Sequence, residues 1–192
     1  MPLWLVGGGY VLGSILPAEW IAKKHMGLTP QQSGMNPGTV SAWKLFGFRV
    51  GLMVLLIDLV KGVIPVALAG RMEIQGIWYA LVAASPVIGH NWPLWRRRGG
   101  GQGVATVTGA LLWLGWWPML LAYLVGAFIG FIFLRWLPAV VLVALPLGYL
   151  LMHVYHLPQE SLQVASILIV LVGVRRLPWI WGALRRKMSK AS

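Results

Sequence analysis

A run of glycines beside three arginines is the segment whose residue types most directly suggest chemistry. Residues 99–103 read Gly-Gly-Gly-Gln-Gly and stand just before an apolar stretch that begins near Val104. The backbone N–H groups of such a loop can converge on one point, where the start of a helix adds positive potential. Arg96, Arg97 and Arg98 precede the glycines, and guanidinium groups suit phosphate oxygens. The segment predicts a phosphate site, although an inner loop whose arginines only set membrane topology would have the same composition.

Three more polar residues lie at or inside apolar stretches. His90 comes three residues before a proline, where an imidazole could act as a general base or hold a substrate hydroxyl, or could simply be solvated. Asp58 and Lys61 are spaced i,i+3, so they share a helix face and can pair. Because an unpaired charge in hydrocarbon is costly, we expect an ion pair or a wet cavity. The pair is then either purely structural or a polar wall of the site.

The polar segment between the first two apolar stretches supplies hydroxyl, amide and ammonium groups. It covers residues 29–44 and is broken by glycine and proline. Ser33, Asn36 and Ser41 can hydrogen-bond phosphate oxygens or glycerol hydroxyls, and Lys44 adds a positive charge. An ordinary connecting loop has the same composition, so both interpretations stay open.

Several kinds of catalytic site are absent from the sequence. There is no cysteine, which excludes a disulfide framework, a thiolate nucleophile and a cysteine-based metal site. There is also no G-x-S-x-G elbow, no Ser-His-Asp signature and no P-loop with its lysine. No spacing of histidines and acids suggests a metal site.

The composition predicts a polytopic membrane protein that positions these groups. Of the 192 residues, 58% are hydrophobic and 10% are charged, whereas soluble domains carry about 25% charged residues. Apolar stretches between breakers predict an all-α fold of about seven transmembrane helices. The expected spans are residues 3–21, 47–69, 76–92, 104–115, 119–134, 137–152 and 162–174, and the fourth and fifth could merge. With no room for a soluble domain, residues 1–192 are expected to form a single membrane-embedded domain.

The positive charges fall mainly on alternate loops. The first, third and fifth loops and the C-terminal tail hold most of them: Lys23, Lys24, Lys44, Arg49, Arg96, Arg97, Arg98, Arg135, Arg175, Arg176, Arg185, Arg186, Lys187 and Lys190. The positive-inside rule therefore predicts an external N-terminus and a cytoplasmic C-terminus, which seven spans satisfy and six would not. The net charge of +12 then points to inner loops, anionic lipid or a phosphorylated substrate, and not to nucleic acid. Most of the twelve tryptophans lie near span ends, as in an aromatic belt.

Taken together, these segments resemble the acyl-phosphate-dependent glycerol-3-phosphate acyltransferases of bacteria, a small family of seven-span membrane proteins. The longest similarity runs without a gap from Gly89-His90 to Thr106, against the family pattern G-H-x-x-P…K-G-G-K-G-V-A-T. The other matching segments are Gly13–Pro17 for G-S-I-P with one inserted residue, Asn36, Gly38 and Gly47 for G-S-G-N-x-G-A-T-N…R…G, and Asp58–Gly62 for D-x-x-K-G.

The sequence departs from the family pattern mainly on the acceptor side. The motif serine falls on Gly34 unless Met35 is an insertion, which would bring Ser33 into its place. The other departures are Ser41 for asparagine, Lys44 for arginine, Gly99 and Gln102 for two lysines, and Arg175-Arg176-Leu177 where H-x-x-N-x-x-R-L is expected, without the histidine and asparagine. The glycine loop that would bind the acyl phosphate therefore matches the family pattern more closely than the residues that would bind the acceptor.

The resemblance implies direct transfer of a fatty acyl group from acyl phosphate to the 1-hydroxyl of glycerol 3-phosphate, giving lysophosphatidic acid. It implies no metal, no cofactor and no covalent acyl-enzyme. The implied roles are catalysis by His90 and Asn36, acyl phosphate binding by Gly100, Gly101, Gln102 and Gly103, glycerol phosphate binding by Ser33, Gly38, Ser41 and Lys44, and support from Asp58, Lys61 and Arg97.

The resemblance also implies a location and partners. We expect a multi-pass protein of the bacterial inner membrane whose site faces the cytoplasm, in contact with membrane lipids and with an enzyme that produces acyl phosphate. Two alternatives stay open: a paralogue that uses another acceptor, and a non-catalytic lipid-binding membrane protein. A transporter would show repeated halves with broken helices, and the sequence has no such repeat.

Overall fold

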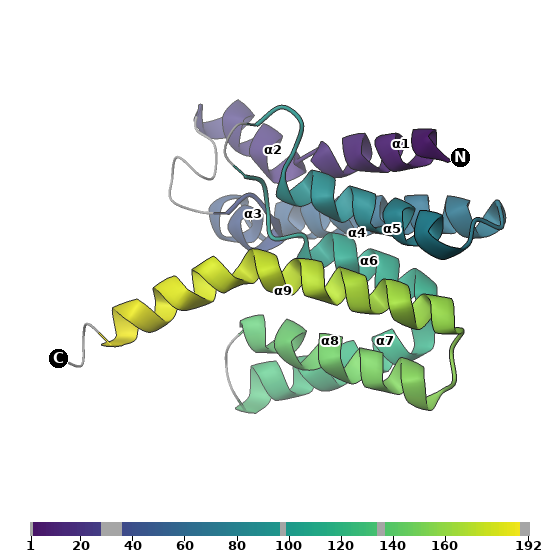
Figure 1. The fold of residues 1–192 in the computed structure, drawn as a ribbon. Coiled ribbons are helices and arrows are strands. Elements are labelled where there is room, and N and C mark those ends of the chain that lie inside the picture. The colour runs from purple at the N-terminus through teal and green to yellow at the C-terminus, as the bar shows by residue number, and fades with distance from the viewer. Residues whose placement is uncertain (1, 28–35, 97–98, 134–136, 189–192) are drawn as a thin grey trace.

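The computed structural model describes residues 2–27, 36–96, 99–133 and 137–188, and all regular structure in these ranges is helical (Figure 1). In chain order the elements are α1 (Leu3–Ser14), α2 (Pro17–Met26), α3 (Thr39–Phe46), α4 (Phe48–Arg71), α5 (Gly76–Asn91), α6 (Val104–Leu114), α7 (Trp116–Phe128), the π-helical turn η1 (Ile129–Phe133), α8 (Leu137–Val154) and α9 (Gln159–Met188). The prediction of an all-α fold is confirmed.

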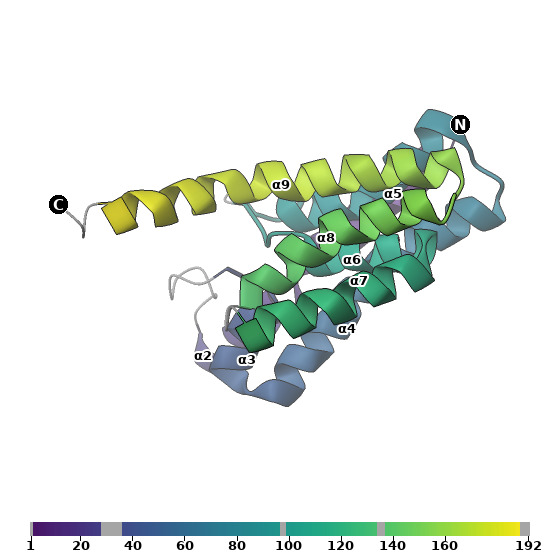
Figure 2. The same cartoon turned by 90° about the horizontal axis from the view of Figure 1, so that it is seen from below.

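The helices form two groups that α9 joins. α1, α4, α5 and α6 pack together, while α7 and α8 pair with each other beside them (Figure 1). α9 contacts α5, α6 and α8, so it bridges the groups. Its C-terminal part runs past the other helices, as two perpendicular views show (Figures 1 and 2). The main buried cluster draws Val66, Val87, Leu111 and Leu168 from α4, α5, α6 and α9.

The first expected span, residues 3–21, lies within a stretch that is long and apolar enough to cross a membrane, Leu3–Met26, but this stretch contains a break. α1 ends at Ser14 and α2 begins at Pro17, and Leu16 between them is extended with φ −112° and ψ 90°. The cause is Pro17, because a proline ring disfavours helical geometry in the preceding residue but fits the first position of a new helix. The break leaves the last carbonyl groups of α1 without helical partners.

The middle spans agree with the prediction to within a few residues. α6 and α7 are separate helices with Gly115 between them, so the possible merger is wrong. α7 begins at Trp116 and not at residue 119, because Pro118 lies in its first turn, where no N–H is needed.

Two segments are more helical than predicted. Residues 39–46 were expected to belong to a loop and form α3. The last span was expected to end at residue 174, but α9 continues to Met188. That expected end rested on the arginines that follow Val174, and arginine is a good helix former. Charges mark the edge of an apolar stretch, not the end of a helix.

Length and hydropathy alone identify two possible membrane crossings in the described chain, Leu3–Met26 and Phe48–Arg71. Val104–Leu114, Trp116–Ile132 and Val140–Val154 are apolar but shorter. The outside of the helices carries many large apolar side chains, among them Leu56, Val60, Leu124, Phe131 and Val170. Soluble monomers rarely expose apolar surface on this scale, so lipid is the expected surrounding medium.

Glycines allow two pairs of helices to approach closely. At the crossing of α1 and α5, Gly13 faces the Pro86 carbonyl and Gly89 faces the Tyr10 carbonyl. At the crossing of α4 and α6, Gly62 faces the Thr106 carbonyl and Gly109 faces the Leu59 carbonyl. Small residues at such crossings are typical of helices packed in lipid. These contacts hold α5, which carries His90, against α1, and α4, which carries Lys61, against the helix that follows the glycine loop.

We expect Gly62→Ala to lower the stability of the purified protein in detergent by about 1–3 kcal/mol, because an added methyl group would meet the backbone of α6 at Thr106 and Ala110. Gly70→Ala is the matched control, since its methyl group would meet only the Tyr79 hydroxyl at 4.0 Å. Both changes place alanine in α4, so their difference isolates the packing cost. Thermal unfolding measures that difference, and equal stabilities would contradict a tight crossing.

Candidate active site

A buried ion pair on α4 contacts the histidine in the last turn of α5. The Lys61 ammonium lies 2.6 Å from Asp58 Oδ1, and both side chains are 2% exposed. His90 Nδ1 lies 3.3 Å from the ammonium nitrogen and 3.7 Å from Asp58 Oδ1. The predicted pairing of Asp58 with Lys61 is confirmed, and the pair lies directly against His90.

The break after α1 completes the surroundings of the ammonium group. Lys61 Nζ donates a hydrogen bond of 2.6 Å to the Ile15 carbonyl. That carbonyl is accessible because α1 ends at Ser14 and α2 begins only at Pro17. Three acceptors therefore surround the three protons of the ammonium: a carboxylate, a backbone carbonyl and an imidazole nitrogen.

This arrangement fixes the proton of His90. With Lys61 in its ammonium form, which only donates, the 3.3 Å contact assigns Nδ1 of His90 as the acceptor and places the ring proton on Nε2. Nε2 faces Gly101, where any side chain would overlap the imidazole. His90 therefore presents an N–H donor toward the glycine loop, which suits it to polarise an oxygen more than to accept a proton.

The glycine loop folds back on the end of α5. Gly100 N–H donates to the Asn91 carbonyl at 2.8 Å, and Gly101 N–H donates to the His90 carbonyl at 3.0 Å. These two N–H groups are thus occupied within the chain, unlike the converging donors that the glycine-rich sequence predicts. The loop needs glycine here for a different reason, namely close backbone approach to His90 and Pro93.

The unused donors lie at the start of α6. Gly103 is the residue before that helix and has φ 70°, a left-handed conformation that favours glycine. The first-turn N–H groups of α6 lack acceptors within the helix. Nearby, both polar atoms of the Asn91 side chain and the Thr106 hydroxyl are buried without a hydrogen-bond partner among the described residues. Buried polar groups nearly always have hydrogen-bond partners, so these Asn91 and Thr106 atoms are available to bind a ligand or water.

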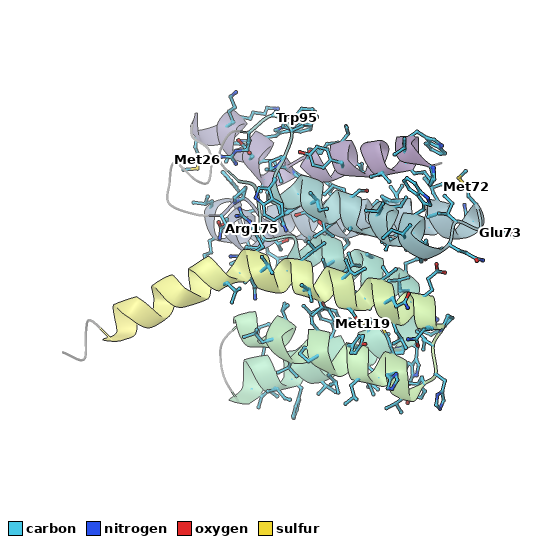
Figure 3. The ribbon with its side chains drawn as sticks, in the orientation of Figure 1. Met26, Met72, Glu73, Trp95, Met119 and Arg175 are labelled. Carbon is cyan, nitrogen blue, oxygen red and sulfur yellow. The ribbon has the colours of Figure 1, made fainter. Side chains whose placement is uncertain are left out.

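Two arginines of α9 hold the other side of the loop. Arg175 donates from Nε to the Gly101 carbonyl and from Nη2 to the Gly100 carbonyl, both at 3.4 Å. Its guanidinium lies over the Trp92 ring, 5.4 Å from the centroid. Arg176 Nε donates to Gln102 Oε1 at 3.1 Å. In Figure 3, Arg175 points from α9 toward the loop between α5 and α6.

These arginines were not among the predicted site residues, because 74 residues or more separate them from their partners in the loop. The signal for them in the sequence is the Arg-Arg-Leu segment that corresponds to the end of the family's final motif.

The segment before the glycines is attached to α1 and α2. Trp95 Nε1 donates to the Ser14 carbonyl at 2.9 Å, and Leu94 N–H donates to the Ser14 hydroxyl at 3.1 Å. Arg96 forms an ion pair of 2.7 Å with Glu19. Arg96 thus serves to anchor this segment, and Arg97, predicted as a supporting residue, lies outside the described residues.

The candidate acceptor residues are only partly brought to this site. The Pro37 carbonyl lies beside Gly101, so Asn36 and Gly38 flank a direct neighbour of the loop. The buried Ser41 hydroxyl donates to the Asn36 carbonyl and is therefore already used. Lys44 is exposed one turn further along α3. Ser33 lies outside the described residues.

Comparison with known proteins identifies a family model and individual proteins that this chain resembles. A family model described as glycerol-3-phosphate acyltransferase matches residues 3–184. The glycerol-3-phosphate acyltransferase of Desulforamulus reducens is 38% identical over 122 residues, 63% of this chain and 61% of that protein. The one from Legionella pneumophila strain Corby is 36% identical over 111 residues, 57% of this chain and 40% of that protein. The chain thus aligns with less than two thirds of the length of these relatives.

A solved structure matches more of the chain. The crystal structure of PlsY (YgiH), an integral membrane glycerol 3-phosphate acyltransferase in its glycerol 3-phosphate form, has a TM-score of 0.84 at 28% identity, covering 95% of this chain and 92% of that chain. Its lysophosphatidic acid form gives 0.81 at 26% identity. The chain is therefore a bacterial membrane protein that belongs to the glycerol-3-phosphate acyltransferase family.

Proposed function

We propose that this chain transfers a fatty acyl group from acyl phosphate to the 1-hydroxyl of glycerol 3-phosphate, giving lysophosphatidic acid for phospholipid synthesis. The observation that carries the proposal is His90, held by Lys61 so that its Nε2–H faces the glycine loop. The family membership and the likeness to PlsY in its glycerol 3-phosphate form support it.

The donor phosphate would bind between the start of α6 and the arginines of α9. The first-turn N–H groups of α6 and the unpaired amide of Asn91 supply donors. Arg175 and Arg176 add positive charge from the side of α9 and hold Gly100, Gly101 and Gln102 in place. Oriented donors of this kind stabilise the negative charge that develops on a leaving phosphate.

In the reaction, the glycerol 3-phosphate hydroxyl oxygen attacks the acyl carbonyl carbon. The bond from that carbon to the phosphate oxygen breaks, and the phosphate leaves with the proton of the hydroxyl. His90 Nε2–H polarises an oxygen of the acyl phosphate, and Asn36 positions the reacting groups. No covalent acyl-enzyme is needed, because proximity and orientation supply much of the rate.

The acceptor would lie against the segment that leads into α3. Gly38 permits the phosphate of the acceptor to approach the backbone closely. Ser33 and Ser41 offer hydroxyl groups, and Lys44 offers a point charge. The exposure of Lys44 and the use of the Ser41 hydroxyl within the chain favour a second candidate, an acyltransferase with another polyol phosphate as acceptor.

The expected membrane arrangement is part of the proposal. Residues 1–192 would act as one domain with seven spans, an external N-terminus and a site that faces the cytoplasm of an inner membrane. Glycerol phosphate would then arrive from water and the acyl chain from lipid, and an enzyme that makes acyl phosphate would be the supplier. The alternating distribution of basic residues supports this orientation.

The test is acyl transfer by the purified protein in lipid vesicles, with palmitoyl phosphate and either glycerol 3-phosphate or other polyol phosphates. Lysophosphatidic acid formation supports the proposal, and product with another acceptor alone selects the second candidate. Saturable lipid binding without turnover would mean a non-catalytic protein.

Arg176→Leu is expected to raise the KM for acyl phosphate about tenfold, because a hydrogen bond to a charged group is worth about 1.5–3 kcal/mol. The KM for the acceptor should change much less. Arg71→Leu is the control, since Arg71 is exposed and precedes Met72 and Glu73, which lie at the opposite end of the molecule from Arg175 in Figure 3. Equal changes in both KM values would contradict a donor-side role for Arg176.

A further inference from the structure

The guanidinium group of Arg175 occupies the space that a side chain at position 99 would need. A Cβ atom added at Gly99 would overlap Arg175 Nη2 and would lie 3.1 Å from Cζ and 3.3 Å from Nη1. All three atoms belong to one guanidinium group, which comes from α9 and not from the loop. The absence of a side chain at Gly99 therefore lets α9 place a positive charge directly against the glycine loop.

Contacts on two sides hold this guanidinium group at the loop. It donates hydrogen bonds of 3.4 Å to the Gly100 and Gly101 carbonyls, and it lies over the Trp92 ring at 5.4 Å from the centroid. α9 packs on α5 and is one continuous helix from Gln159 to Met188, so Arg175 projects from a fixed element. The position of the charge is thus set by the packing of α9.

No carboxylate neutralises Arg175 within the part of the chain that the structure describes. The ion pairs there are those of Lys61, His90 and Arg96. A guanidinium group has five N–H donors, and the two hydrogen bonds to the loop use two of them. The remaining donors and the uncompensated charge suit the oxygens of a phosphate group.

The family pattern carries a positive charge at the same place on a different residue. Where this chain has Gly99, the pattern K-G-G-K-G begins with a lysine, and where it has Arg175, the pattern H-x-x-N-x-x-R-L leaves the residue before its arginine unspecified. A lysine at position 99 and Arg175 could not both keep their places, because the side chains would overlap and their like charges would repel.

We propose that Gly99 and Arg175 form an exchanged pair, in which α9 supplies to the donor phosphate site the positive charge that the family pattern carries on the loop. The pair rests on the proposed function and names the cation that the donor phosphate would meet. Each member of the pair then depends on the other, because the glycine makes room for the arginine and the arginine replaces the missing lysine.

The test restores the lysine of the family pattern with and without Arg175. Gly99→Lys is expected to raise the KM for palmitoyl phosphate about tenfold, because the new side chain displaces and repels the guanidinium group. Arg175→Ala should raise it by about the same factor through loss of a charge-assisted hydrogen bond. Gly99→Lys/Arg175→Ala should return it to within about threefold of the wild type. Independent effects would multiply to about a hundredfold, and that result would overturn the proposal.

Gly99→Met/Arg175→Ala is the matched control for charge. It fills the same space with an unbranched side chain that carries no charge, so only the packing is restored. We expect its KM for palmitoyl phosphate to stay about tenfold above that of the wild type, with little change in the KM for glycerol 3-phosphate. Equal recovery with methionine and with lysine would mean that the pair only fills space, which would overturn the role of the charge.

Binding of inorganic phosphate separates the exchanged pair from the proposed reaction. Phosphate that binds the folded protein raises its unfolding temperature, which is measured in detergent. We expect this stabilisation in the wild type and in Gly99→Lys/Arg175→Ala, and a much smaller one in either single variant and in the methionine control. That pattern without turnover would retain the cation site while the proposed reaction fails. Turnover with equal stabilisation of all the variants would overturn the exchanged pair and leave the proposed reaction in place.

Discussion

Gly101→Ala is expected to reduce kcat/KM for acyl transfer at least about a hundredfold. The added methyl group would overlap His90 Nε2 and lie 2.9 Å from the Pro37 carbonyl. Either the imidazole or the loop must then move, and a displacement of about 1 Å at reacting groups is enough for a hundredfold loss. The measurement is steady-state kinetics with palmitoyl phosphate and glycerol 3-phosphate in vesicles.

Gly99→Ala is the matched control in the same loop. Its methyl group would meet the guanidinium of Arg175, which is the far end of a flexible side chain and can move aside. That movement disturbs the hydrogen bonds of Arg175 to Gly100 and Gly101 but leaves His90 in place, so we expect Gly99→Ala to lose only about tenfold in kcat/KM. Gly101→Ala should retain the thermal stability of the wild type within a few degrees. Similar activity in both variants would mean that His90 does not act at Gly101.

Lys61→Met is expected to destabilise the protein by about 3–5 kcal/mol and to abolish measurable turnover. It leaves the Asp58 carboxylate buried without its partner, which is the cost typical of a broken buried pair. It also removes the donor that keeps the proton of His90 on Nε2. Thermal unfolding in detergent and turnover in vesicles measure the two effects separately.

The double variant Asp58→Leu/Lys61→Met distinguishes a structural pair from a positioning pair. Removing both charges should restore most of the stability, because no uncompensated charge remains. Activity should stay low, since His90 Nδ1 still lacks its donor. If the double variant recovers both stability and activity, the pair serves folding alone.

The sequence was sufficient where a local rule decided the structure. The i,i+3 spacing of Asp58 and Lys61 predicted their contact, and the start of α6 at Val104 followed from the glycines before it.

Other features depended on contacts that a linear reading does not contain. Pro17 indicates a break in the first span, but the length of the apolar stretch around it favoured a continuous span. The contact of Arg175 with the glycine loop requires α9 to pack on α5 and to continue beyond residue 174. The internal hydrogen bonds of Gly100 and Gly101 depend on the loop folding back over α5, which composition cannot specify.

The donor side and the acceptor side of the site differ in how far they could be predicted from the sequence. Residues from the end of α5 to the start of α6 are continuous in the sequence and also lie together around His90 in the structure. Their resemblance to the family was therefore enough to predict that they belong to one site. The acceptor candidates lie on a segment that must fold over the bundle from another part of the chain. Their positions depend on α3, a helix that the polar composition did not predict.

The ion pair inside α4 bears on how the chain enters the membrane during synthesis. Each charge at the centre of a membrane helix costs about 2.5–3.5 kcal/mol on insertion scales. Asp58 and Lys61 lie on one helix, so α4 brings its own counter-ion and needs no later helix to neutralise it. The Ile15 carbonyl that caps the ammonium belongs to a segment made earlier. When α5 is inserted, His90 therefore joins a polar environment that is already built, and biogenesis can follow the order of the chain.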